Sequence, residues 1–317
     1  MITPPVLFVI FNRPDTTALV MEAIRAVRPE RLYVAADGPR ERNGDAARCE
    51  EARRIATEVD WPCELNTLFR NRNLGCGRAV SGALDWFFEH EEEGIILEDD
   101  CLPSHSFFRY CAELLERYRH DKRIMCISGN NFQTKNVTPY SYYFSRYSHC
   151  WGWATWRRAW ALYDFDIARR IDFRQLGHLE AWSDGDPSFG RYWVDISEQM
   201  VRGEIDTWDY QWLFSCWTQH GLTCLPVRNL VTNIGVGPDA THTTDVNGRA
   251  ACLPLKELDF PLGHPPLVVR HVEADRFTHL HHFGVRQNYD CRKSATFATI
   301  RQLIKRVPLA AILLAKI

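Results

Sequence analysis

The first half of the chain alternates apolar runs with segments of helical periodicity. The apolar runs lie at 6–10, 32–36, 94–97 and 124–128, and a further strand is predicted at 64–69. Continuous runs of this length are typical of strands buried on both faces of a sheet. Between them, apolar residues recur every three or four positions over 16–27, 44–59, 79–88 and 107–118, which predicts amphipathic helices. This rhythm predicts an α/β fold with a mainly parallel central sheet flanked by helices.

The second half of the chain has a different pattern. Residues 140–160 are rich in aromatic side chains, a helix is predicted over 210–220, and an apolar segment follows at 222–227. The stretch 234–249 is rich in Gly, Thr and Asp, as expected of a loop. We therefore divide the chain into a sheet-forming half (1–135), a second half (136–285) and a C-terminal tail (286–317).

Composition excludes several classes of protein. The chain has 317 residues, and 38 basic against 40 acidic residues leave a formal net charge of −2, without the basic excess of a general nucleic-acid binder. The 11 cysteines are scattered and never spaced as Cys-x-x-Cys, so neither a zinc site nor a disulfide framework is predicted. Cys126 and Cys216 lie among apolar neighbours and are predicted to be buried thiols. Reduced thiols favour a cytoplasmic protein.

A run of three carboxylates, Glu98-Asp99-Asp100, follows the apolar run at 94–97. Asp37 and Asn130 also follow predicted strands, and ligands of parallel sheets bind where strands end. Adjacent carboxylates repel one another, and a hard divalent cation bound through oxygen would relieve the repulsion. The alternative is a solvated acidic turn. Since adjacent side chains cannot all point at one ion, we expect one metal ligand and two carboxylates that contact the bound donor.

Several motifs, in this order, resemble glycosyltransferase family 13, the N-acetylglucosaminyltransferase I-like enzymes with a GT-A fold. The likeness runs over most of residues 5–245. It rests on the following segments: the first strand at 5–13, Asp37, the acidic motif with its continuation to Phe108, the strand and loop at 126–131, Gly152-Trp153 with Trp160, Trp208-Asp209, and 224–226 through Asn233 to Thr241-His242. The resemblance implies a Rossmann-like nucleotide-diphospho-sugar transferase fold and a donor lid in the second half.

The resemblance also implies roles for individual residues. Asp100 would bind Mn²⁺ (or Mg²⁺), which holds the diphosphate of a nucleotide sugar. Glu98 and Asp99 would contact the donor sugar and the ribose. The other residues implied at the donor are Arg13 at the nucleotide, Asp37 at the uracil, Trp208, and Thr241 and His242 at the diphosphate. For Arg13 a surface or strand-capping role stays open.

Asp209 is the candidate catalytic base. Direct displacement at an anomeric carbon needs one carboxylate to take the proton of the acceptor hydroxyl. Asp206 is the nearest competitor, and a helix cap is the alternative role for Asp209. Trp153 is predicted at the acceptor, although a hydrophobic core is the alternative for the aromatic residues of 140–160. His279, His281 and His282 are spaced like a metal cluster, but we interpret 278–283 as a strand or surface segment.

These observations predict a metal-dependent inverting hexosyltransferase. It would move a sugar, GlcNAc or a related hexose, from a UDP-sugar donor to a glycan or lipid-linked acceptor. A sugar-phosphate nucleotidyltransferase and a non-enzymatic carbohydrate-binding protein are the alternatives, but residues 11–14 lack the glycine-rich basic loop that the former needs. Residues 301–317 hold four basic side chains and no acidic one. This basic amphipathic tail either rests on a membrane surface or packs against the catalytic domain. We therefore expect a cytoplasmic protein, with peripheral contact to the inner face of a membrane through this tail as one alternative.

Overall fold

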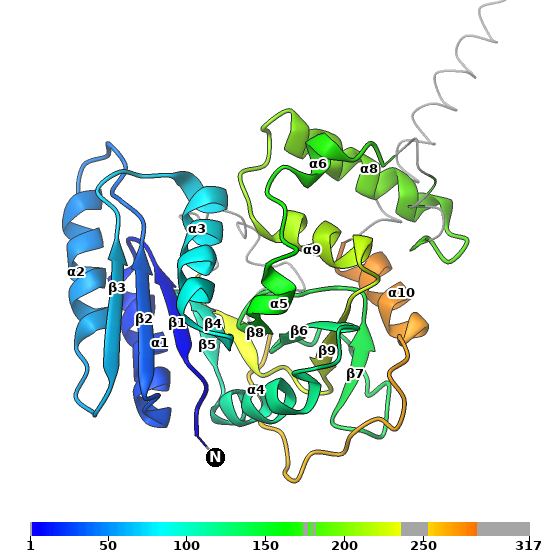
Figure 1. The fold of residues 1–317 in the computed structure, drawn as a ribbon, viewed down its shortest axis with the longest axis horizontal. Coiled ribbons are helices and arrows are strands. Elements are labelled where there is room, and N and C mark those ends of the chain that lie inside the picture. Colours follow the sequence, from blue (N-terminus) through cyan, green and yellow to red (C-terminus); the bar gives the residue numbers. More distant parts are fainter. Residues whose placement is uncertain (1, 174–176, 178, 180–181, 236–252, 284–317) are drawn as a thin grey trace, which may run out of the picture.

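An eight-stranded central sheet organises the chain (Figure 1). The computed structural model describes residues 2–173, 177, 179, 182–235 and 253–283. The strands of the sheet follow the order β3-β2-β1-β4-β8-β6-β9-β7, and Figure 1 shows it running from β3 at the left edge to β7 at the right. A separate two-stranded sheet joins β5 and β10. The predicted α/β class, with a central sheet flanked by helices, is confirmed.

The N-terminal part of the sheet is parallel throughout. Each of its elements lies where the apolar pattern predicts it. They are β1 (Val6–Ile10), α1 (Pro14–Val27), β2 (Arg31–Ala36), α2 (Asp45–Thr57), β3 (Glu64–Phe69), α3 (Gly75–His90) and β4 (Glu93–Glu98). Because β2 and β4 both pair with β1 in the same direction, the carboxyl ends of these three strands meet at one edge of the sheet.

The remaining part of the sheet is mixed. Its strands are β6 (Ile124–Ser128), β7 (Tyr142–Ser145), β8 (Trp153–Trp156) and β9 (Leu222–Pro226). β8 lies between β4 and β6 and is antiparallel to both, whereas β9 is parallel to β6 and antiparallel to β7. The aromatic stretch at 140–160 therefore contributes two strands, β7 and β8, that the apolar pattern did not separate. Three strands of the second predicted half, β7, β8 and β9, thus belong to the same sheet as the strands of the first.

Helices cover both faces of the sheet. The remaining elements are β5 (Cys101–Pro103), α4 (His105–Tyr118), α5 (Arg157–Trp160), α6 (Ile167–Arg170), α8 (Pro187–Val201), α9 (Asp209–Thr218), β10 (Val231–Asn233) and α10 (Val272–His281). Alternate residues of β1 point to opposite faces. Phe8 packs with α1, α2 and α4, whereas Leu7 packs with α3, α5 and α9. A further aromatic cluster joins α8 to α9 around Trp193 and Trp217.

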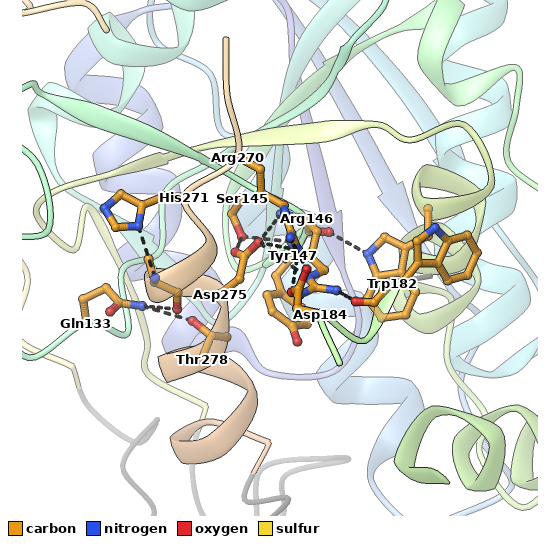
Figure 2. A network of polar contacts seen from close by, with 12 residues as sticks. Gln133, Ser145, Arg146, Tyr147, Trp182, Asp184, Arg270, His271, Asp275 and Thr278 are labelled. Carbon is orange, nitrogen blue, oxygen red and sulfur yellow. Dashed lines mark hydrogen bonds and ion pairs between the residues drawn. The ribbon is translucent and has the colours of Figure 1, made fainter. Parts of the chain in front are cut away.

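A buried polar network holds α10 against β7 (Figure 2). Asp275 has no exposed surface and accepts hydrogen bonds from the Ser145 hydroxyl and the Arg146 amide. Arg146 and Arg270 both pair with Asp184 as well as lying 3.6 Å from Asp275. The prediction of a strand or surface segment at 278–283 is wrong, because Ala274, Asp275 and Thr278 form the buried face of a helix.

Two predicted features lie outside the described residues. They are the donor lid with Thr241 and His242, and the C-terminal tail at 286–317. Among the described residues, no helix has the length and apolar character to cross a membrane. Cys126 and Cys216 are buried free thiols, as predicted.

Candidate active site

A cavity of about 410 Å³ opens where β1, β2 and β4 end. Strand ends and the residues after them contribute part of its wall. The start of α3, the segment 205–210, the end of β10 and the residues just before β8 contribute further parts. Carboxylates outnumber guanidinium groups among the described lining residues. The carboxylates are Asp37, Glu98, Asp99, Asp100, Asp206 and Asp209, and the guanidinium groups are Arg13 and Arg40. All predicted site residues within the described part of the chain line this cavity, except Trp153.

Asp99 and Asp100 of the acidic triplet both lie near Arg13 but differ in their hydrogen bonds. Asp99 Oδ2 accepts a hydrogen bond of 2.9 Å from the amide of Phe11, the residue after β1. Asp100 Oδ2 pairs with Arg13 Nη1 at 2.5 Å, and the same Nη1 lies 3.8 Å from Asp99 Oδ1. The parallel register of β1 and β4 sets Val9 beside Glu98, so the residues after each strand meet.

Burial makes the ionised forms of two of these carboxylates costly. It raises the pKa of Glu98 well above its usual range, and the charges of Asp100 and Asp99 add to the shift. Burial likewise raises the pKa of Asp99 to about 7, with the neighbouring Asp100 as the second cause. Arg13 opposes both shifts but is a single positive charge. The cavity therefore favours a further cation.

A short antiparallel ladder brings a distant segment to the acidic triplet. β5 pairs with β10, with Cys101 opposite Asn233, and the Ile234 amide donates to the Asp100 carbonyl at 2.8 Å. The Gly235 backbone then lies so close to Asp100 and Arg13 that a Cβ at position 235 would overlap the Asp100 carboxylate. A side chain at 235 would thus crowd the group predicted to bind metal.

The carboxylate oxygens of the cavity suit a divalent cation that a phosphorylated ligand also binds. Among the described residues, no three His, Cys, Asp or Glu side chains form a metal-binding cluster. Mg²⁺ and similar hard ions are commonly held by one or two carboxylates together with substrate phosphates. Asp100 supplies such a carboxylate. Arg13 occupies its Oδ2, and within the described part of the chain its Oδ1 accepts only a weak contact of 3.5 Å from the Cys101 thiol.

Asp37 anchors the turn that leads into α3. Its carboxylate accepts hydrogen bonds from the amides of Gly38 at 2.9 Å and Leu74 at 2.9 Å. Burial raises the pKa of Asp37, although these amide donors oppose the shift. Gly38 is required here, because a Cβ would overlap the backbone of Arg72. Asp37 is therefore both a lining residue and a structural anchor.

Arg40 is a lining residue that the sequence analysis missed. Its guanidinium lies 4.9 Å from the ring centroid of Phe11 and is held by Asp45, which has no exposed surface. Asp45 also accepts from Arg48 and from Asn12 Nδ2, and the Arg40 hydrogen bond lowers the pKa of Asp45 below its usual range. The sequence signal was the charged turn at 37–45, where Arg40 and Asp45 follow the strand end.

The two candidate bases in the segment before α9 have different surroundings. Asp206 accepts hydrogen bonds of 3.0 Å from the amides of Cys76 and Gly77, at the start of α3. Asp209 Oδ1 accepts from the Thr207 hydroxyl and from the Tyr210 amide. Within the described residues, Asp209 Oδ2 has no hydrogen-bond partner. The geometry thus gives Asp206 the capping role and leaves one Asp209 oxygen available in the cavity.

Trp153 lies in the core rather than in the cavity wall. It has no exposed surface and stacks on Trp208 with centroids 5.4 Å apart. A fully buried ring cannot touch an acceptor in this conformation, so its position does not match the contact that we predicted. Trp151, which the sequence analysis did not select, lines the cavity instead. Asn130 does not line it but accepts from the Trp151 amide at 3.1 Å.

Comparisons with known proteins add a distant likeness. No family model matches the chain, and no curated protein matches it by sequence. It is similar to a mannosyltransferase from Pyrobaculum calidifontis solved with GDP-mannose and Mn²⁺ (15% identity, TM-score 0.39, covering 68% of this chain and 70% of that one). It is also similar to mouse xyloside xylosyltransferase 1 in its apo form (10% identity, TM-score 0.34, covering 67% of this chain and 80% of that one). A third similar structure is the inositol-1-phosphate CTP transferase of T. maritima (10% identity, TM-score 0.30, covering 50% of this chain and 74% of that one). At these scores the likenesses carry no argument about chemistry.

Proposed function

We propose that this protein is a metal-dependent glycosyltransferase with a GT-A fold, which moves a hexose from a nucleotide-diphosphate donor, a UDP-sugar, to a glycan or lipid-linked acceptor. The observation that carries the proposal is the acid-rich cavity at the ends of β1, β2 and β4, with Asp209 in the same wall. A nucleotide diphosphate is itself an anion, so it can enter such a cavity only with a cation.

Asp100 would hold the metal together with the diphosphate of the donor. When bound, Mn²⁺ or Mg²⁺ stabilises the negative charge that develops on the leaving diphosphate. Arg13 lies beside Asp100 and would contact the nucleotide. Glu98 and Asp99 would accept hydrogen bonds from hydroxyl groups of the donor sugar and the ribose. Asp37, at the end of β2, would contact the base, with Trp208 also at the donor.

Asp209 would take the proton of the attacking acceptor hydroxyl. Thr207 and the Tyr210 amide hold Oδ1, so Oδ2 would be the oxygen that accepts the proton. A single displacement of this kind inverts the anomeric configuration. Trp153 would act only through Trp208, which it supports from the core. The finer likeness to family 13, and GlcNAc as the sugar, stay predictions.

A nucleotidyltransferase is the second candidate, because it would also use strand-end carboxylates and a metal. It must bind a nucleoside triphosphate, which carries more negative charge than a diphosphate sugar. The described lining offers Arg13 and Arg40 as cations, and both already pair with carboxylates. The cavity therefore favours the donor with the smaller charge.

The test is a binding and turnover screen. UDP-GlcNAc, UDP-GalNAc, UDP-glucose and GDP-mannose are titrated by calorimetry with Mn²⁺ and with EDTA. We expect at least one UDP-sugar to bind only with metal and to release UDP slowly when water replaces the acceptor. Failure of all four donors to bind with Mn²⁺ contradicts the proposal. Release of pyrophosphate from UTP and a sugar phosphate would favour the nucleotidyltransferase.

A further inference from the structure

Arg13 lines the active-site cavity with a fixed main chain and a partly exposed side chain. It is the residue before α1, and its carbonyl accepts from the Thr17 amide at 3.0 Å and from the Thr17 hydroxyl at 2.7 Å. The side chain of Arg13 is 24% exposed, and that of its partner Asp100 is 16% exposed. A ligand in the cavity can therefore reach both members of this ion pair.

The Arg13 guanidinium occupies the carboxylate that the proposed function assigns to the metal. Its Nη1 lies 2.5 Å from Asp100 Oδ2 and 3.8 Å from Asp99 Oδ1. A divalent cation on Asp100 would lie close to this guanidinium, and like charges repel. Arg13 in this position therefore competes with a metal ion for the negative charge of Asp100.

The main chain at the end of β10 covers the ion pair on one side. A Cβ built at Gly235 would overlap Asp100 Oδ2 and would lie 2.7 Å from Arg13 Nη1. The Ile234 amide fixes this segment, because it donates to the Asp100 carbonyl at 2.8 Å. An Arg13 side chain that leaves Asp100 would therefore turn into the cavity rather than towards β10.

Arg40, the other guanidinium of the described lining, is held more firmly. It pairs with Asp45, which has no exposed surface and also accepts from Asn12 Nδ2. Removing a partner from a fully buried carboxylate is costly. Asp100 is partly exposed, so the ion pair of Arg13 is the easier one to open.

We propose that Arg13 holds the metal-binding carboxylate of Asp100 until a nucleotide diphosphate draws the guanidinium away. The inference rests on the proposed function for its choice of a diphosphate. A planar guanidinium matches phosphate oxygens well, so Arg13 can exchange Asp100 for a phosphate of the nucleotide. The exchange frees Asp100 for the metal ion that the same diphosphate binds. Nucleotide and metal would then each raise the affinity for the other by the same factor.

The test is calorimetric titration of Mn²⁺ into the wild type and Arg13→Gln, without nucleotide and at a fixed UDP concentration. The Mn²⁺–UDP complex in solution is measured separately. Without UDP, the variant should bind Mn²⁺ about 5-fold more tightly, which corresponds to the upper strength of an exposed ion pair. In the wild type, UDP should raise Mn²⁺ affinity by about 5- to 150-fold, the usual range for coupled sites. In the variant this factor should be about 5-fold smaller, because the contribution of Arg13 is gone.

Two further variants separate competition from a general effect of charge or folding. Arg13→Lys keeps the positive charge and should bind Mn²⁺ as weakly as the wild type without UDP. Arg54→Gln removes a guanidinium from an exposed ion pair with Glu51 on α2, outside the cavity, and should match the wild type in both titrations. The Arg13 side chain makes no capping hydrogen bond to α1, so its variants should keep the circular dichroism spectrum of the wild type.

The sign of the change without UDP decides whether Arg13 competes with the metal. If Arg13→Gln binds Mn²⁺ no more tightly than the wild type, Arg13 does not compete and the proposal is overturned. Equal tightening with and without UDP also overturns it, because Arg13 would then stay on Asp100 when the nucleotide is bound. Either result in a protein that binds UDP with Mn²⁺ leaves the proposed function intact. Absence of UDP–Mn²⁺ binding in the wild type contradicts the proposed function, and the exchange with it.

Discussion

Neighbouring carboxylates of the acidic triplet have different surroundings and therefore different chemistry. Asp99 accepts a hydrogen bond from the Phe11 amide at the end of β1, whereas Asp100 pairs with Arg13 through Oδ2. From the described residues, Asp100 Oδ1 receives only the weak Cys101 contact. Glu98 is the last residue of β4 and also lines the cavity. The weakly held Oδ1 of Asp100 supports the proposed metal role for this residue.

Asp100→Ala should abolish metal-dependent UDP binding while the protein stays folded. Outer partners of metal ligands typically contribute 10- to 100-fold in affinity, so loss of a ligand should cost at least about 100-fold. Calorimetry with UDP and Mn²⁺ measures this loss. Asp259→Ala, at an exposed carboxylate outside the cavity, is the control. Unchanged Mn²⁺–UDP affinity in Asp100→Ala contradicts the metal assignment.

Asp209→Asn should keep donor and metal affinity but lose most turnover. Asn retains an oxygen that can accept from Thr207 and the Tyr210 amide, so the local structure should persist. General-base catalysis typically contributes about 10²–10⁴-fold, and the loss should lie in that range. NMR of the product should show the anomeric configuration opposite to that of the donor. A retained configuration, or near-normal turnover in the variant, would rule out the assigned role.

At the scale of elements, the start of α3 and the segment before α9 depend on one carboxylate. Asp206 bonds the amides of Cys76 and Gly77, and a Cβ at Gly75, where φ is +79°, would crowd the same side chain. A negative charge at a helix N-terminus is favourable because it meets unpaired amides and the helix dipole. The cap thus links α3 to the segment that carries Asp209.

Asp206→Ala should therefore lower the free energy of unfolding. A lost N-terminal cap costs about 0.5–2 kcal/mol, and Asp206→Asn should recover part of it because Asn also caps. Urea unfolding of the two variants and the wild type measures the difference. Because the cap also positions the segment 205–209, turnover should fall in parallel with stability. Equal stability of all three proteins would show that the cap contributes nothing.

At the scale of the whole molecule, packing converts polar aromatic side chains into parts of the core. His279 is 3% exposed, packs 5.0 Å from Phe189, and has both ring nitrogens buried without hydrogen-bond partners among the described residues. Burial lowers its pKa to about 4, although Asp186 opposes the shift. This imidazole is therefore neutral near pH 7 in the folded protein. Among the described residues it belongs to no group of three possible metal ligands.

Acid should destabilise the protein through His279. Above pH 6.5 the imidazole is neutral in both states, whereas between pH 6.5 and 4 only the unfolded state binds the proton, so the free energy of unfolding falls as pH falls. The contribution is roughly 2–3 kcal/mol over this range. Other groups also titrate in this range, so the free energy of unfolding is compared between the wild type and His279→Phe, by urea unfolding at pH 7 and at pH 4.5. Between pH 7 and pH 4.5 the wild type should lose more stability than the variant.

The control for this prediction is His281→Phe, on the same helix but exposed. Its unfolding free energy should follow that of the wild type at both pH values. If the free energy of unfolding changes with pH in the same way for the wild type and His279→Phe, then His279 has the same pKa in the folded and unfolded states and the prediction is wrong.

The sequence by itself determined the parallel part of the fold. Strands β1, β2, β4 and β6 and helices α1 to α4 follow the apolar runs and the helical periodicity closely, because burial on one or two faces leaves a local signal. The strand-end rule also selected Asp37, Asp99 and Asp100, which do line one cavity. Asn130 follows β6 but lies outside the cavity, since it is used to hold Trp151.

Only the tertiary structure decided how the second half meets the first. The aromatic residues of 140–160 lie in buried strands, in a short helix and in the cavity wall alike, so the pattern could not separate β7 and β8 or tell the buried Trp153 from the lining Trp151. Nor could it distinguish Asp206 from Asp209, because their partners lie on α3, about 130 residues away, and on the neighbouring residues of the same segment. Local patterns record which side chains are buried, but the partner of a polar side chain is set by the contacts between distant elements.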